Sequence, residues 1–106
     1  MATRYSFFAL LKATPAWLAL PRSERNRFNS EELGALFARF PQVGVRMYDC
    51  EAFTGRYSNI VVFETEEVHA YHLLIDSLRD SRVFSVPYFE FVDIVPAIEE
   101  HPVPRS

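Results

Sequence analysis

Residues 5–11 constrain the fold more than any other segment, because all of them except Ser6 are apolar. So short an apolar run is typical of a β-strand that is buried on both faces. Successive side chains of a strand point to opposite faces, which places on one side Phe7, Ala9 and Leu11 and on the other Phe8 and Leu10. We therefore expect a sheet that needs an apolar layer on each face.

The remaining patterns predict two helices and three further strands. Thr14 before Pro15 predicts a capped helical turn. Apolar residues at helical spacing predict helices over residues 21–40 and 66–80. Residues 22–27, the first part of the earlier helix, are polar all round, so we expect them to run along the surface. Alternating or continuous apolar residues predict strands over residues 43–48, 57–64 and 88–95, and Pro96 is expected to end the last strand.

The resulting order, β-α-β-β-α-β, predicts a ferredoxin-like α+β domain with both helices on one face of a four-stranded antiparallel sheet. We expect residues 1–96 to form this single domain and residues 97–106 to form a flexible tail. Because the second sheet face is also apolar, we expect a second copy of the chain to cover it, giving a homodimer.

Four stretches carry a resemblance to a known family: residues 11–18 (LKATPAWL), 46–53 (RMYDCEAF), 78–80 (LRD) and 87–90 (PYFE). With them the chain resembles the dimeric α+β barrel superfamily, and within it the darcynin family, over nearly its whole length. The resemblance implies the fold and a dimer. Similar barrels include cofactor-independent monooxygenases, small isomerases, polyketide cyclases, haem enzymes and proteins with no known reaction, so the fold alone does not select an activity.

Several function classes have no support in the residues. A net charge of −3 without a block of Lys or Arg argues against a nucleic-acid partner. The N-terminus lacks the features of a signal peptide, and no apolar run reaches the roughly 18 residues that span a bilayer, so we expect a cytoplasmic protein with no membrane segment. Cys50 is the single cysteine. Glycine-rich phosphate loops and zinc-ligand spacings are both missing, and His69 and His72 diverge on a helix, so we expect no metal and no cofactor.

The candidate catalytic residues are Arg46, Tyr48, His72 and Glu90. Arg46 and Tyr48 have the opposite strand parity to Val45 and Met47, so we expect them to point into the barrel. An arginine that is partly removed from water needs an anion. That anion is either a substrate or a carboxylate such as Glu64 or Glu90, and a structural ion pair at the dimer rim is the alternative. His72, at the border of an apolar helical stripe, is either a general acid or base or a partly buried helix residue.

The candidate substrate-binding residues are Trp17, Phe8, Leu10 and Tyr88. Trp17 is either a wall of a pocket or a plug of the core. The leading hypothesis is a small cofactor-independent enzyme, an isomerase, cyclase or monooxygenase, that acts on an apolar ring-containing or polyketide-like molecule in a barrel cavity. Arg46 would stabilise an enolate-like oxyanion, Tyr48 would donate a hydrogen bond, and His72 or Glu90 would move the proton. The alternative is a non-enzymatic dimeric binding or assembly module.

Overall fold

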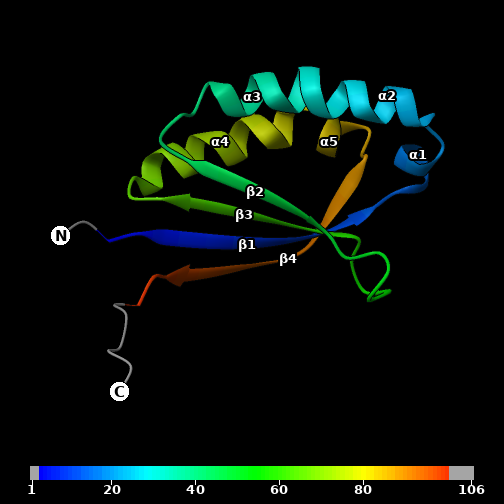
Figure 1. Cartoon of the computed structure of the whole chain (residues 1–106). Helices are drawn as coiled ribbons and strands as arrows, with labels where there is room; N and C mark the ends of the chain where they lie inside the picture. Colours follow the sequence, from blue (N-terminus) through cyan, green and yellow to red (C-terminus); the bar gives the residue numbers. More distant parts are fainter. Residues whose placement is uncertain (1–2, 101–106) are drawn as a thin grey trace.

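A computed structural model describes residues 3–100 and shows a four-stranded antiparallel sheet (Figure 1). The strands are β1 (Tyr5–Ala13), β2 (Gly44–Asp49), β3 (Asn59–Thr65) and β4 (Phe89–Ile98), in the spatial order β2-β3-β1-β4. The apolar strand β1 lies inside the sheet between β3 and β4. The predicted ferredoxin-like α+β fold is confirmed.

The helices cover one face of this sheet and leave the other face uncovered (Figure 1). The longest is α4 (Val68–Asp80). The connection from β1 to β2 holds α1 (Pro15–Leu18), α2 (Arg22–Arg27), the π-helix η1 (Phe28–Leu33) and α3 (Gly34–Ala38). A short helix, α5 (Arg82–Ser85), follows α4. None of the helices within residues 3–100 is both long enough and apolar enough to cross a bilayer.

The core lies between the sheet and these helices. Ala9 of β1 and Leu74 of α4 have no exposed surface, and Phe63 of β3 is 1% exposed. The ring of Phe7 stacks on that of Tyr71 in α4, with 3.7 Å between the ring centroids. The odd-numbered residues of β1 therefore share one face, as the alternation of a strand predicts, and that face packs against the helices.

The uncovered sheet face, which we call the open face, carries the even-numbered residues of β1. Phe8 pairs with Val62 of β3 and Val95 of β4. Phe8 remains 39% exposed and Val95 45% exposed. The two-sided apolar pattern of the sheet is thus present in the structure, with one apolar side covered by helices and the other open.

Three details differ from the sequence-based expectations. The helix expected over residues 21–40 is interrupted by η1, and α5 follows α4 where no further helix was expected. Strand β4 continues through Pro96 to Ile98, so Ala97 and Ile98 are not part of a tail. Proline is tolerated there because β4 is an edge strand. Residues 101–106 of the expected tail lie outside the described residues.

Candidate functional site

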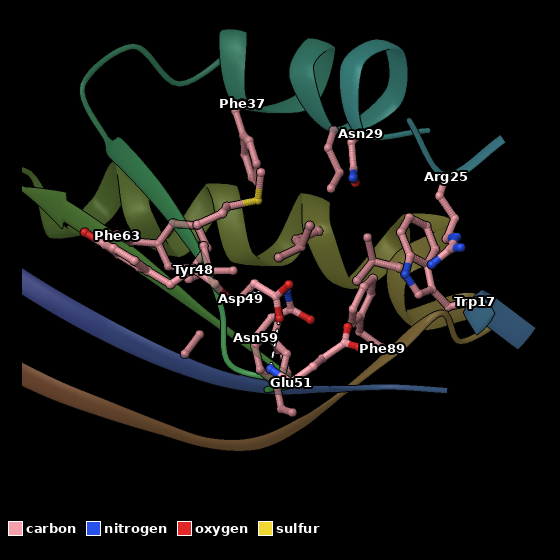
Figure 2. A pocket seen from close by; sticks show the side chains of 18 of the residues that line it. Trp17, Arg25, Asn29, Phe37, Tyr48, Asp49, Glu51, Asn59, Phe63 and Phe89 are labelled. Atoms are coloured by element: carbon pink, nitrogen blue, oxygen red, sulfur yellow. Dashed lines mark hydrogen bonds between the residues drawn. The ribbon is translucent and has the colours of Figure 1, made fainter. Parts of the chain in front are cut away.

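A cavity of about 330 Å³ lies between the helices and the sheet, at the end of the domain where α1 and α2 begin (Figure 2). It is on the helix-covered face, whereas the sequence placed a cavity on the opposite side of the sheet. Its floor and inner walls are apolar and come from every layer of the fold: Ala9, Leu11, Leu33, Phe37, Val61, Phe63, Leu78, Val83, Phe89 and Phe91. Such a wall suits a flat or ring-containing molecule.

Trp17 forms one side of this cavity and is 7% exposed. The hydroxyl of Thr14 caps α1, accepting a hydrogen bond from the backbone N–H of Trp17 at 3.4 Å and donating to the carbonyl oxygen of Pro87 at 2.7 Å. The indole lies 4.9 Å from the ring of Phe89 and 5.5 Å from that of Tyr88. Trp17 is therefore both a buried core residue and a cavity wall, the two alternatives the sequence left open.

The mouth of the cavity is polar, with its positive side chains on the helix side and its negative side chains on the sheet side. Arg22, Arg25, Asn26 and Asn29 reach it from α2 and the start of η1. From the sheet side come Asp49, at the end of β2, with Glu51 and Asn59. Figure 2 shows Arg25 beside Trp17 and Phe89, and Asp49 near Asn59 and Glu51. The cavity thus joins an apolar interior to an entrance with cationic and anionic sides.

Arg25 carries the most informative atom of the site. Its Nε is buried from solvent and has no hydrogen-bond partner. A buried donor without a partner is costly, and a cationic donor more so, and in native proteins such groups call for an explanation. Because Arg25 lines the cavity, an anionic or carbonyl oxygen of a bound molecule can bind its guanidinium group.

The π-helix η1 explains how the polar and apolar parts meet. Phe28 and Leu33 are both buried, although they are five residues apart. Five residues fill slightly more than one turn of a π-helix, which places both side chains on the inner side. The wide turn also keeps Asn29 at the cavity. Single π-turns of this kind are frequently found at functional sites.

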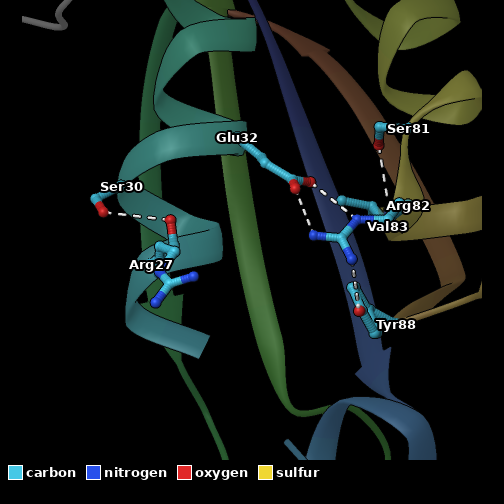
Figure 3. A network of polar contacts seen from close by, with 7 residues as sticks. All are labelled: Arg27, Ser30, Glu32, Ser81, Arg82, Val83 and Tyr88. Carbon is cyan, nitrogen blue, oxygen red and sulfur yellow. Dashed lines mark hydrogen bonds and ion pairs between the residues drawn. The ribbon is translucent and has the colours of Figure 1, made fainter. Parts of the chain in front are cut away.

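A network around Arg82 holds η1 against α5 (Figure 3). The Nε of Arg82 donates to Glu32 of η1 at 3.2 Å, and a second guanidinium nitrogen contacts the other oxygen of that carboxylate. Another donates to the Tyr88 hydroxyl at 3.3 Å, and the guanidinium lies 5.4 Å from the ring centroid of Phe28. The hydrogen bond with Glu32 raises the pKa of the Arg82 guanidinium, so Arg82 stays charged. The network supports the roof of the cavity.

The structure brings together only part of the predicted site. Trp17 and Tyr48 line the cavity, and Tyr88 lies behind Trp17. Tyr48 pairs with Ile60 in the edge strand β2. His72 is elsewhere, on an exposed part of α4, where its Nε2 lies 3.2 Å from a carboxylate oxygen of Asp76.

The other predicted residues lie on the open face. They are Phe8, Leu10, Arg46 and Glu90. Arg46 Nε is 3.8 Å from Glu64 Oε1, and the Arg46 side chain is 69% exposed. Glu90 is exposed and pairs in register with Lys12. The roles predicted for these four residues therefore require a molecule or a partner bound at the open face. Those roles remain predictions.

The cavity does not fit a haem group. Haem iron is most often held by a histidine or a cysteine and less often by a methionine or a tyrosine. Neither histidine nor cysteine lines the cavity within residues 3–100, and the lining residues Met47 and Tyr48 are each about half exposed. The volume of about 330 Å³ is at the lower end for a ligand pocket. Nor do three His, Cys, Asp or Glu residues of the described part of the chain cluster as metal ligands would. We derive no step through haem.

Comparison with known proteins gives three results. Among curated sequences, Darcynin 1 of Acinetobacter baumannii is 48% identical over 78% of this chain and 92% of its own. A darcynin homolog of Streptomyces avermitilis is 43% identical over 87% of this chain and 76% of its own.

Among solved structures, a mutant chlorite dismutase of Candidatus Nitrospira defluvii matches with a TM-score of 0.78 and 12% identity, covering 97% of this chain and 43% of that one. The dimeric chlorite dismutase of Nitrobacter winogradskyi gives a TM-score of 0.65 at 22% identity, covering 92% of this chain and 56% of that one. At these identities the likeness shows the fold alone, and this chain spans about half the length of either structure.

The family comparison completes the assignment that residues 11–18, 46–53, 78–80 and 87–90 suggested. The profile described as "Darcynin, domain of unknown function" matches residues 2–103. The chain belongs to the darcynin family and has the fold of the chlorite dismutase domains.

Proposed function

We propose that this protein is a small cofactor-independent enzyme that acts on a molecule with an apolar ring in the cavity between its helices and its sheet. The reaction is an isomerisation, a cyclisation or an oxygenation. The observation that carries the proposal is the buried Nε of Arg25, which has no partner and belongs to a residue lining an aromatic cavity. A carbonyl or anionic oxygen of the substrate binds the Arg25 guanidinium.

The three reaction types share one electrostatic requirement. Each passes through an anion whose charge rests largely on an oxygen, formed when a neighbouring C–H or O–H loses its proton. A positioned N–H donor stabilises that charge, and loss of one such donor typically costs about 100- to 1000-fold in rate. Arg25 provides such a donor next to the buried aromatic side chains of Trp17 and Phe89.

The open face supports a homodimer as part of the same proposal. Phe8 and Val95 leave a large apolar area exposed there, and a second copy of the sheet is the simplest cover. A structural relative is described as dimeric. Arg46 and its partner Glu64 would then lie at or near the interface. A protein that only binds or assembles through this face, without turnover, is the alternative function.

Binding and turnover can be tested with the purified full chain. Melting is followed with 3-phenylpropanoate, acetophenone and larger polyketide-like rings, because a bound ligand raises the melting temperature by mass action. The same molecules are incubated in air without added cofactor and examined by mass spectrometry. Unchanged mass with altered retention indicates isomerisation, and loss of water indicates cyclisation. Gain of one oxygen with loss of two hydrogens indicates oxygenation, with the second oxygen atom leaving as water.

Arg25→Met should abolish the ligand-induced shift and any turnover, because methionine keeps the packing of the stem and removes the donors. Arg27→Met is the matched control. It lies on the same helix, two residues later, and its guanidinium is exposed and faces Glu24 at 3.7 Å. Equal effects of the two substitutions would show that Arg25 has no specific role in ligand binding or turnover. Binding without any turnover would favour the binding module.

A further inference from the structure

We propose that the molecule bound in this cavity is zwitterionic: a compound with a single ring and, at one end of the molecule, both an acid group and an amino group. This inference rests on the proposed function and narrows its substrate class. It comes from the arrangement of charges around the mouth of the cavity and from the size of the space behind them.

The two charged sides of the mouth are not neutralised by each other. Arg22 and Arg25 stand on the helix side, and Asp49 and Glu51 on the sheet side. Within the described part of the chain, no ion pair or side-chain hydrogen bond joins the arginines to these carboxylates. The one polar contact of Asp49 is local, from the backbone N–H of Glu51 to Asp49 Oδ1 at 2.9 Å. Both kinds of charge are therefore free to bind a ligand.

A ligand with a single charge would leave one side of the mouth unmatched. A carboxylate near Arg25 pairs with its guanidinium, but the same carboxylate is repelled by Asp49 and Glu51 across the cavity. An ammonium group placed beside those two carboxylates turns the repulsion into attraction. Electrostatic complementarity thus favours a molecule with both groups over either one alone.

The interior limits the rest of the molecule to about one ring. The cavity volume is about 330 Å³, and the space behind the charged mouth is enclosed by aromatic and aliphatic side chains, among them Trp17, Phe89 and Leu33. A ring enters this apolar part while the charged groups stay at the mouth, where Asp49 and Glu51 are exposed. An aromatic amino acid has this division between ring and charges.

Three probes of nearly equal size separate the contributions of the two groups. L-phenylalanine has both charges, 3-phenylpropanoate has only the acid, and 2-phenylethylamine has only the amine. Their dissociation constants are measured by titration calorimetry on the full chain at low salt. We expect L-phenylalanine to bind up to about fivefold more tightly than either single-charge probe, since it differs from each by one partly exposed ion pair, which contributes at most about that factor.

Substitutions assign the effect to each side. The double variant Asp49→Asn, Glu51→Gln should remove the advantage of L-phenylalanine over 3-phenylpropanoate and leave 3-phenylpropanoate binding as well or better. The amide introduced at position 49 keeps an oxygen that can accept from the backbone N–H of residue 51. Arg25→Met should weaken both acids but not 2-phenylethylamine. Glu66→Gln, an exposed acid away from this cavity, is the control and should change none of the three constants.

The possible failures are distinct. If 3-phenylpropanoate binds, depends on Arg25 and is no weaker than L-phenylalanine, the zwitterion inference is wrong and the proposed small-molecule site stands. If none of the three probes binds to a folded protein at millimolar concentration, the inference is wrong, and the proposed function stands only if the larger rings of the previous section bind. If the double variant binds L-phenylalanine as tightly as the wild type, the assignment of the amino group to Asp49 and Glu51 is overturned.

Discussion

Substitution of Leu74 by alanine tests how helix α4 packs on the sheet. Leu74 has no exposed surface and belongs to the core beneath α4, outside the cavity lining. Removing its three outer carbons loses their burial and leaves a void, which costs about 2–5 kcal/mol in comparable sites. With a urea m-value of about 1.5 kcal/mol/M for a domain of this size, a loss of about 3 kcal/mol lowers the unfolding midpoint by about 2 M.

The chain provides both the probe and the control for this experiment. Trp17 is the single tryptophan and is buried, so its fluorescence reports unfolding of the helix layer against the sheet. Leu73 is the neighbouring residue on α4 and is 43% exposed, so Leu73→Ala should change stability by only about 0.5 kcal/mol. Protein concentration is held fixed, because a dimer would make stability depend on it. Similar midpoints for the two variants would refute the orientation of α4 described above.

Three further predictions concern the open face and pH. Sedimentation at micromolar concentration should give twice the chain mass, and Phe8→Asp should reduce it to the chain mass or impair folding; a well-folded wild-type monomer would contradict the dimer. Arg46→Ala should lower the free energy of unfolding by less than about 1 kcal/mol if Arg46 only forms the exposed ion pair with Glu64. If Arg46→Ala and Tyr48→Phe instead lose binding or turnover at unchanged stability, the predicted catalytic roles are supported. Burial raises the pKa of Tyr71 above 10.0. The stability that the neutral Tyr71 hydroxyl provides is therefore fully present below pH 10 and is lost as the pH rises through the pKa of the folded state. In melting curves measured at increasing pH, Tyr71→Phe should reduce this alkaline loss of stability.

Much of the fold could be predicted because its strongest signals are local. The apolar run of residues 5–11 predicts a central strand with two apolar sides. In the sheet, Phe8 lies opposite Val62 on one neighbouring strand and Val95 on the other, so the second side is apolar across three strands. The helix α4 follows its apolar stripe closely. The end of β4 could not be predicted in this way. Whether proline stops a strand depends on whether that strand lies at the edge of the sheet, and this is a property of the assembled sheet rather than of the sequence around Pro96.

The candidate site was missed for a different reason, which residues 22–37 make clear. Arg22, Arg25, Asn26 and Asn29 line the cavity at helical spacing, and the same inward stripe continues as Leu33 and Phe37. A polar half-helix is usually read as solvent-exposed, and Arg22, Asn26 and Asn29 are indeed exposed, but that interpretation does not reveal that they also line the mouth of a cavity. The informative signal was the continuity of the stripe: polar residues occupied the positions where the following apolar residues face the core. When the inward stripe of a helix changes from apolar to polar along its length, the apolar end covers a core and the polar end covers a space that must hold water or a ligand. Arg25, with its unpartnered Nε, lies at the polar end of this helix.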